Sequence, residues 1–229
     1  MMSVFYNGRK ISELWHNGKR VAELWHNGKR IYKRRTEPLV KEFLTPGSFT
    51  WSVPSWASKV VVLAVSGGWG GHDGDGSFAS TGSGGGAGGI DYQTFSTSGI
   101  SSITGTVGRG GKPRPYSGSG DSPTSTTVTV GTQKMSIKIG GADTSGQNGS
   151  VFGWGTISTE DARLMQLDAV PGVYRGDSGK GLYAGPGGSG NGKPGKRGGG
   201  GSGGNGGFFN NFTAGGKGGD GFVRLIFWP

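Results

Sequence analysis

The 229-residue sequence contains no cysteine, so neither a disulfide nor a thiolate metal site contributes to its fold. It has no apolar run of 18 residues, and its first residues lack the apolar stretch of a secretory signal. We therefore expect no membrane insertion. A protein of this kind that acts outside a cell would need another route of release, such as lysis.

Hydrophobic residues make up only 31% of the chain and charged residues only 17%, whereas 53 residues are glycine. Average proteins contain about 45–50% apolar residues with glycine included, so packed side chains alone cannot fill this chain. Glycine does not recur strictly at every third position, which excludes collagen. Seven Trp, eleven Phe and six Tyr are too many for a chain that buries nothing.

A ten-residue repeat occupies the N-terminus, with the copies YNGRKISELW, HNGKRVAELW and HNGKRIYKRR. Each copy contains Asn-Gly, the strongest short signal for a β-hairpin, because a type I′ turn needs positive φ at both central residues. The residues between the turns alternate as strands do. We therefore predict a four-stranded β-meander over residues 3–34, inside an N-terminal region 1–37.

The net charge of +10 is concentrated in this region. Residues 1–37 hold nine Lys and Arg against three Glu, a net of +6, and the remaining 192 residues carry only +4. Strands this short do not form a stable sheet alone, so another surface must pack against them. We expect docking to a partner, with packing on the chain's own body as the alternative. The attachment candidates are Trp15, Trp25, Arg20 and Arg30.

Residues 38–229 form a second region with clear strand patterns. Phe49–Val53 alternates, and Lys59–Val65 is an almost continuous apolar run, typical of a strand buried on both faces. A hydroxyl followed by acids predicts one short helix over 158–167. Several short strands separated by turns indicate an all-β, sandwich-like scaffold. The further strand candidates are Asp91–Thr97, Ser102–Val107, Thr126–Val130, Lys134–Ile139 and Phe222–Trp228.

Glycine tracts separate these strands. Residues 67–89 contain twelve glycines in 23 positions, and residues 181–221 contain twenty in 41. Such tracts usually indicate flexible linkers, but here aromatic residues recur inside them and a clean strand closes the chain. We therefore predict that they form a bundle of polyglycine II, that is, PPII-like helices, whose backbones hydrogen-bond to one another.

No motif for catalysis, a metal or a cofactor stands out. Residues 187–193 spell GxxxxGK, but Pro194 replaces the Ser or Thr of a phosphate-binding loop. Calcium-loop patterns at HDGDGS and at 215–223 are fragments. His16 and His26 directly precede Asn-Gly turns, and a position beside a turn explains both residues without a catalytic role. We predict no enzyme, no cofactor and no metal. The RGG fragments at 109–111 and 197–199 leave nucleic-acid binding as a less favoured alternative.

The region from residue 43 resembles the glycine-rich domain of bacteriophage tail proteins. The resemblance rests on FLTPGSFTWSVP at 43–54, the strand Lys59–Val65, GGWGG at 67–71 and the closing GGKGGDGFVRLIFWP at 215–229. It is similar in style to the distal adhesins of T-even tail fibres, in which stacked polyglycine II helices display loops that bind host receptors. The N-terminal repeat departs from those adhesins and looks like leader segments of other tail proteins.

The resemblance implies a virion protein of the tail tip or fibre, made in the host cytoplasm and released by lysis. Its partners would be other tail proteins, an oligomeric tail assembly or further copies of the chain, and a host-surface receptor or glycan. A purely structural tail component without host contact is the alternative. Residues between the glycine tracts would contact the receptor, and the candidates are Trp69, His72, Asp73, Arg114, Tyr116, Trp154 and Tyr174.

Overall fold

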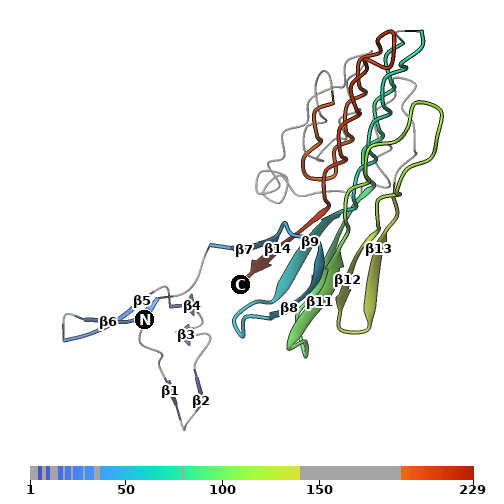
Figure 1. Cartoon of the computed structure of the whole chain (residues 1–229). Coiled ribbons are helices and arrows are strands. Elements are labelled where there is room, and N and C mark those ends of the chain that lie inside the picture. The colour runs from blue at the N-terminus through green and yellow to red at the C-terminus, as the bar shows by residue number, and fades with distance from the viewer. Residues whose placement is uncertain are drawn as a thin grey trace.

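Figure 1 shows the computed structural model of the chain. The structure describes residues 37–78, 80–139 and 192–229, together with short pieces of the N-terminal repeat, namely 5–6, 9–10, 15–17, 19–21, 23–27 and 29–33. The predicted helix over 158–167 and the contact candidates Trp154 and Tyr174 lie outside the described residues.

Two antiparallel four-stranded sheets form a sandwich (Figure 1), with the strand orders β10-β9-β14-β7 and β13-β12-β11-β8. This arrangement confirms the predicted all-β, sandwich-like scaffold. The first sheet consists of β7 (Leu39–Phe43), β9 (Lys59–Val65), β10 (Ile90–Ser96) and β14 (Phe222–Trp228). The second consists of β8 (Gly47–Ser52), β11 (Ser102–Val107), β12 (Thr126–Val130) and β13 (Gln133–Ile137).

Alternating residues of both sheets meet in one apolar core. Leu225 and Phe227 of β14 are fully buried there against residues of β11, β12 and β13. The other face of the first sheet is also apolar and buried, with Val61 and Leu63 fully inaccessible. Strand β9 is therefore buried on both faces, as its continuous apolar run predicts. Arg224 on that outer face is neutralised by Glu42 of β7, which its Nη2 contacts at 2.6 Å.

The predicted strands lie where the sequence places them, with ends that shift by at most two residues. Strands β9, β11, β12 and β14 match their predicted bounds, and β10 begins and ends one residue earlier. Strand β7 has no counterpart in the sequence predictions, because its segment LVKEF mixes charged and apolar residues. It pairs with β14 and completes the first sheet.

In the described pieces of the N-terminal repeat, the strands pair as three two-stranded hairpins, where the sequence predicts one four-stranded meander. The hairpins pair β1 (Phe5–Tyr6) with β2 (Arg9–Lys10), β3 (Trp15–His16) with β4 (Lys19–Arg20), and β5 (Glu23–His26) with β6 (Lys29–Lys33). Among the described pieces, each strand pairs with its partner across the Asn-Gly turn. The turns are as predicted: Asn17 and Asn27 have φ of 48° and 47°.

At one end of the sandwich, the chain continues into extended glycine-rich segments that run side by side (Figure 1). The described residues contribute segment I (66–77), segment II (80–89), segment III (108–115), segment IV (192–196), segment V (198–207) and segment VI (213–221). Segments I and III prolong β9 and β11, and segments II and VI lead into β10 and β14. The bundle is thus a direct extension of the sandwich strands.

Backbone hydrogen bonds between these segments recur at every third residue. In segment I, the N–H groups of Gly68, Gly71 and Gly74 donate to carbonyls of segment VI at 2.9–3.0 Å, and the N–H groups one position later donate to segment II at 2.8 or 2.9 Å. Three residues per turn is the repeat of the polyproline II helix. The predicted polyglycine II bundle is therefore present in the described residues.

Glycine is required inside the bundle because neighbouring backbones leave no room for a side chain. A Cβ atom added at Gly71 would lie closer than 3.0 Å to the carbonyl of Ser202 in segment V, and one at Gly218 would meet the carbonyl of Gly68 in segment I. Real Cβ atoms do not approach a carbonyl this closely. The glycine tracts are therefore ordered structural elements and not linkers.

Candidate functional site at the bundle tip

Two hairpin tips meet at the end of the bundle farthest from the sandwich (Figure 1). One tip joins segments I and II, and the other joins segments V and VI. The N–H of Gly207 donates to the carbonyl of Asp75 at 2.9 Å, and the N–H of Asn210 donates to the carbonyl of Gly76 at 3.0 Å. The two tips thus form one hydrogen-bonded surface, which we call the tip.

The tip displays four phenylalanines to solvent. The relative exposures are 79% for Phe78, 62% for Phe208, 100% for Phe209 and 42% for Phe212. They come from both hairpins, about 37 Å from the sandwich if segment I rises by roughly 3.1 Å per residue. Single exposed apolar residues are ordinary, but a group of large aromatics on one rigid end is typical of a binding surface.

Phe209 is held in an unfavourable backbone conformation. Its φ is +57°, in the left-handed region that bulky residues rarely adopt, and the following Asn210 has φ of +60°. The left-handed conformation costs roughly 1–2 kcal/mol for a residue with a Cβ atom. Because its side chain is fully exposed, no packing of Phe209 within the chain offsets this strain.

The polar groups of the tip are mainly neutral. Asp75 accepts a hydrogen bond from the N–H of Ser77 at 2.7 Å, which closes the first hairpin. In the second hairpin, the N–H of Asn205 donates to Thr213 Oγ1 at 2.7 Å. These bonds fix both loops, so the phenylalanines sit on an ordered backbone. Such an arrangement suits contact with an apolar or ring-shaped partner at low entropic cost.

Three of the predicted contact residues lie along the side of the bundle below the tip. Trp69 and His72 both project from segment I onto segment III. The guanidinium of Arg114 stands 5.5 Å from the centre of the Trp69 ring, and His72 Nδ1 lies 2.8 Å from the carbonyl of Pro115. Arg114 is buried and donates through Nε to the carbonyl of Gly70 at 3.0 Å. Arg114 therefore holds segments I and III together.

The remaining candidates are dispersed. Asp73 accepts a hydrogen bond from the N–H of Gly215 at 2.8 Å and so connects segments I and VI. Tyr116 follows segment III and is exposed. The described candidates thus lie along the side of the bundle below the tip, and the structure does not bring them together at the tip.

The attachment candidates occupy equivalent positions in successive hairpins. Trp15 stands opposite Arg20 across the second hairpin, and Trp25 stands opposite Arg30 across the third. The Trp25 side chain is exposed, and its Nε1 donates to Glu23 Oε2 at 3.1 Å. The repeat therefore presents the same aromatic and basic pair twice.

Sequence reasoning did not single out the four exposed phenylalanines of the tip, although a signal for Phe78 exists. From Ser66, the side chains Trp69, His72, Asp75 and Phe78 follow at intervals of three, mostly with two small residues between them. In a helix of three residues per turn such positions share one side, and the series ends at the hairpin tip. An X-Gly-Gly spacing thus indicates which side chains share one side of the segment and where that series ends.

The described residues contain no group of three or more His, Cys, Asp or Glu that could hold a metal ion. Among the same residues, no helix is long and apolar enough to cross a membrane.

A known protein family matches most of the chain. The family model of the glycine-rich domain matches residues 44–228, which spans the sandwich and the bundle together. No curated protein matches the chain. The matched range begins at the β7–β8 turn and ends in the last strand, so it contains the folded unit described above except β7. The chain belongs to the glycine-rich domain family.

Proposed function

We propose that this chain is a virion protein of a bacteriophage tail tip or fibre, and that it binds a host-surface receptor through the tip of its glycine bundle. The observation that carries the proposal is the rigid display of Phe78, Phe208, Phe209 and Phe212 at the far end of the bundle. The resemblance of residues 43–71 and 215–229 to phage tail domains supports it.

The chemistry of the tip suits stacking against sugar rings or apolar receptor loops. Phenylalanine offers large contact area with only two side-chain torsions, so little entropy is lost on binding. Asn205, Asn210 and Asn211 beside the rings supply hydrogen-bonding groups. Aromatic anchors of this kind each contribute roughly 1–4 kcal/mol when they are buried at a contact.

The strain at Phe209 is a second support. A glycine at this position would remove the Cβ atom that disfavours positive φ. An exposed aromatic residue at a position where glycine would be more stable is consistent with a role in contact.

The N-terminal hairpins would provide the attachment to other tail proteins or to further copies of the chain. Their basic residues and the repeated Trp–Arg pairs are at the end of the chain that does not enter the bundle. Labelling of intact virions with an antibody against the chain tests this placement, because the label should appear at the distal tail.

The receptor role is tested with the variants Phe208→Ser/Phe209→Ser and Phe209→Gly. Adsorption of the purified chain to host cells should fall at least tenfold for the double variant. Phe209→Gly should bind more weakly. Its free energy of unfolding should nevertheless rise by about 1 kcal/mol, because the strained φ is relieved. Leu44→Ser, at an exposed apolar residue between β7 and β8, is the control and should adsorb normally.

Normal adsorption of the double variant would overturn the receptor proposal. If the chain is found in virions and binds no cell, the purely structural tail role becomes the better account. A chain that is absent from virions would contradict both.

A further inference from the structure

Segment VI lies in the middle of one flank of the bundle, between segments III and IV. The N–H of Gly218 donates to the carbonyl of Gly111 in segment III at 2.9 Å, and the N–H of Gly195 in segment IV donates to the carbonyl of Lys217 at 2.9 Å. Segments I and V hydrogen-bond to the inward sides of segment VI. Its remaining side therefore faces outward, with segments III and IV on either side.

The outward positions of these three segments are basic. Lys193 and Lys196 are three residues apart in segment IV, and Arg109 and Lys112 are three apart in segment III, so each pair points to one side of a three-residue helix. Lys217 occupies the outward position of segment VI between them. All five side chains are exposed. We call this set of parallel rows the cationic flank.

Two carboxylates offset part of this charge. Lys112 Nζ pairs with Asp121 Oδ2 at 2.7 Å, and Lys217 Nζ pairs with Asp220 Oδ1 at 3.0 Å. With Arg197 in the adjoining turn, the flank holds six cations against two acids, a formal charge of +4. Among the residues that the structure describes, two of these six cations therefore have an acidic partner in the flank.

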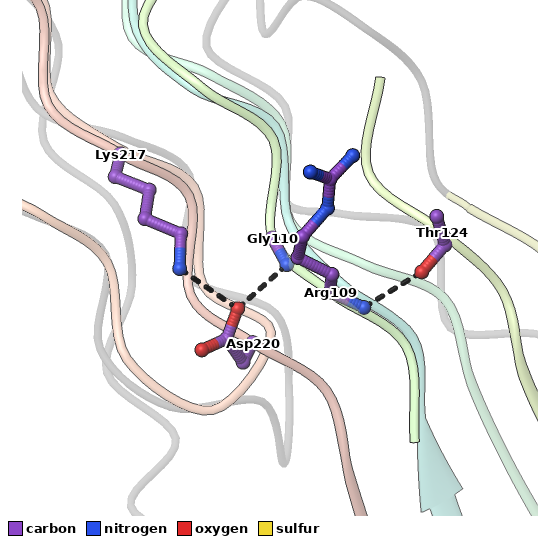
Figure 2. Close-up of polar contacts among 5 residues, drawn as sticks. All are labelled: Arg109, Gly110, Thr124, Lys217 and Asp220. Carbon is purple, nitrogen blue, oxygen red and sulfur yellow. Dashed lines mark hydrogen bonds and ion pairs between the residues drawn. The ribbon is translucent and has the colours of Figure 1, made fainter. Parts of the chain in front are cut away.

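The acids of the flank also have structural roles. Figure 2 shows Asp220 between Lys217 and the N–H of Gly110, which donates to Asp220 Oδ1 at 2.8 Å and so links segments VI and III. The hydrogen bond from Lys112 lowers the pKa of Asp121, with smaller help from Arg109. By contrast, Lys193 and Lys196 form no ion pair with any residue that the structure describes.

We propose that the cationic flank binds an anionic polysaccharide, with carboxylate or phosphate groups on sugars that recur along the polymer. Along the rows of segments III and IV the cations are about 9 Å apart, three residues at roughly 3.1 Å each. The rows are fixed by the hydrogen-bonded backbone, so a polymer with regularly spaced charges can match them without ordering the protein.

The spacing favours a glycan over a nucleic acid. A DNA strand carries a phosphate about every 3.4 Å along the helix axis, far more densely than the rows of the flank. A polysaccharide with one acidic sugar among neutral ones has sparser charges, nearer to the spacing of the rows. This inference does not depend on the tip, whose exposed residues are aromatic and mainly neutral, nor on a role in phage tails.

Binding of the full-length chain to hyaluronate, in which acidic and neutral sugars alternate, to polygalacturonate, to neutral dextran and to a short DNA duplex tests the proposal at low and moderate salt. Lys193→Gln/Lys196→Gln should weaken binding to at least one anionic glycan about tenfold. The control Lys134→Gln/Lys138→Gln removes the same charge from exposed positions of the second sheet and its end, and should change binding less than twofold. Both variants should melt like the parent, because all four side chains are exposed.

The outcomes are distinct. Equal loss in both variants would show that overall charge alone drives binding, and no loss in either would show that the flank is not the site. Tighter binding to DNA than to both anionic glycans, lost in the flank variant, would identify a nucleic-acid surface. Each of these results overturns the proposal. Tighter binding to hyaluronate than to polygalacturonate, lost in the flank variant, would support the match in charge spacing. Loss of cell adsorption in the tip variants leaves this test unaffected.

Discussion

The sandwich and the bundle are held together by different chemical groups. In the sandwich, buried Val, Leu, Ile and Phe side chains from two sheets fill the interior. In the bundle, the interior consists of glycine backbones whose N–H groups donate to carbonyls of neighbouring segments. Apolar burial is non-directional and scales with area, whereas a backbone hydrogen bond depends on the position and angle of each neighbour. The bundle therefore tolerates less change per residue than its small side chains suggest.

Two buried hydroxyl groups join these regions. Ser66 Oγ accepts from the N–H of Gly89 at 2.8 Å and donates to the carbonyl of Lys138 at 2.9 Å. Thr126 Oγ1 accepts from the N–H of Gly108 at 2.9 Å and donates to the carbonyl of Val65 at 2.7 Å. At this level the sheet ladder ends and the bundle pattern begins, and the hydroxyls satisfy backbone groups that neither pattern pairs.

The largest expected effect is in the sandwich. Phe227→Ala removes a fully buried ring from the core between the sheets. It should lower the free energy of unfolding by about 3–5 kcal/mol, measured by chemical denaturation. A loss below about 1 kcal/mol would mean that the bundle, and not the side-chain core, dominates stability.

An intermediate effect is expected in the bundle. Gly71→Ala places a Cβ atom against the carbonyl of Ser202, so segments I and V must separate. The loss should be about 3 kcal/mol, and hydrogen exchange should accelerate in the bundle before it does in the sheets.

Gly118→Ala is the control for this bundle variant, because its Cβ would meet only the side chain of Pro115, at 3.1 Å. It should change stability by less than about 0.5 kcal/mol. Parent-like exchange in the Gly71 variant, or equal losses in both variants, would contradict the backbone-packed interior.

The smallest effect concerns Asp91 at the start of β10. Burial raises its pKa above the ordinary value of 3.8, although hydrogen bonds from the N–H of Tyr92 and from Gln93 act in the opposite direction. The folded chain then binds the Asp91 proton more tightly than the unfolded chain does. Stability therefore falls as the pH rises from about 3.8 through the higher pKa of the folded state. Asp91→Asn should melt slightly higher than the parent at pH 7, and the difference should shrink below pH of about 4. A constant difference at all pH values would exclude this cause.

Much of the sandwich could be predicted from sequence because its strands carry the signals that burial requires. Lys59–Val65 and Phe222–Trp228 are continuous apolar runs, and both form central strands. Strand β7 could not be found this way. Lys41 lies over the rings of Phe43 and Trp51, and Glu42 pairs with a distant arginine, so its charged residues have partners that only the fold brings near.

The bundle could be predicted as an architecture, but the exposure of each of its aromatic residues could not. Aromatics between glycine tracts were reasonable candidates, yet Trp69 packs beside Arg114 whereas Phe209 is fully exposed. Composition does not distinguish them, since both are aromatic residues near glycines. The difference is set by position in a three-residue helical repeat and by where each hairpin turns.

The three-residue hydrogen-bond pattern also restricts how the length of this domain can change. Adding one Gly-Gly-X triplet to each arm of a hairpin would extend the bundle by about 9 Å and return every following side chain to its former direction. An insertion of one or two residues would rotate the rest of that segment and direct side chains into neighbouring backbones. Related chains should therefore differ in bundle length by multiples of three residues per segment, and irregular insertions should be confined to the hairpin tips.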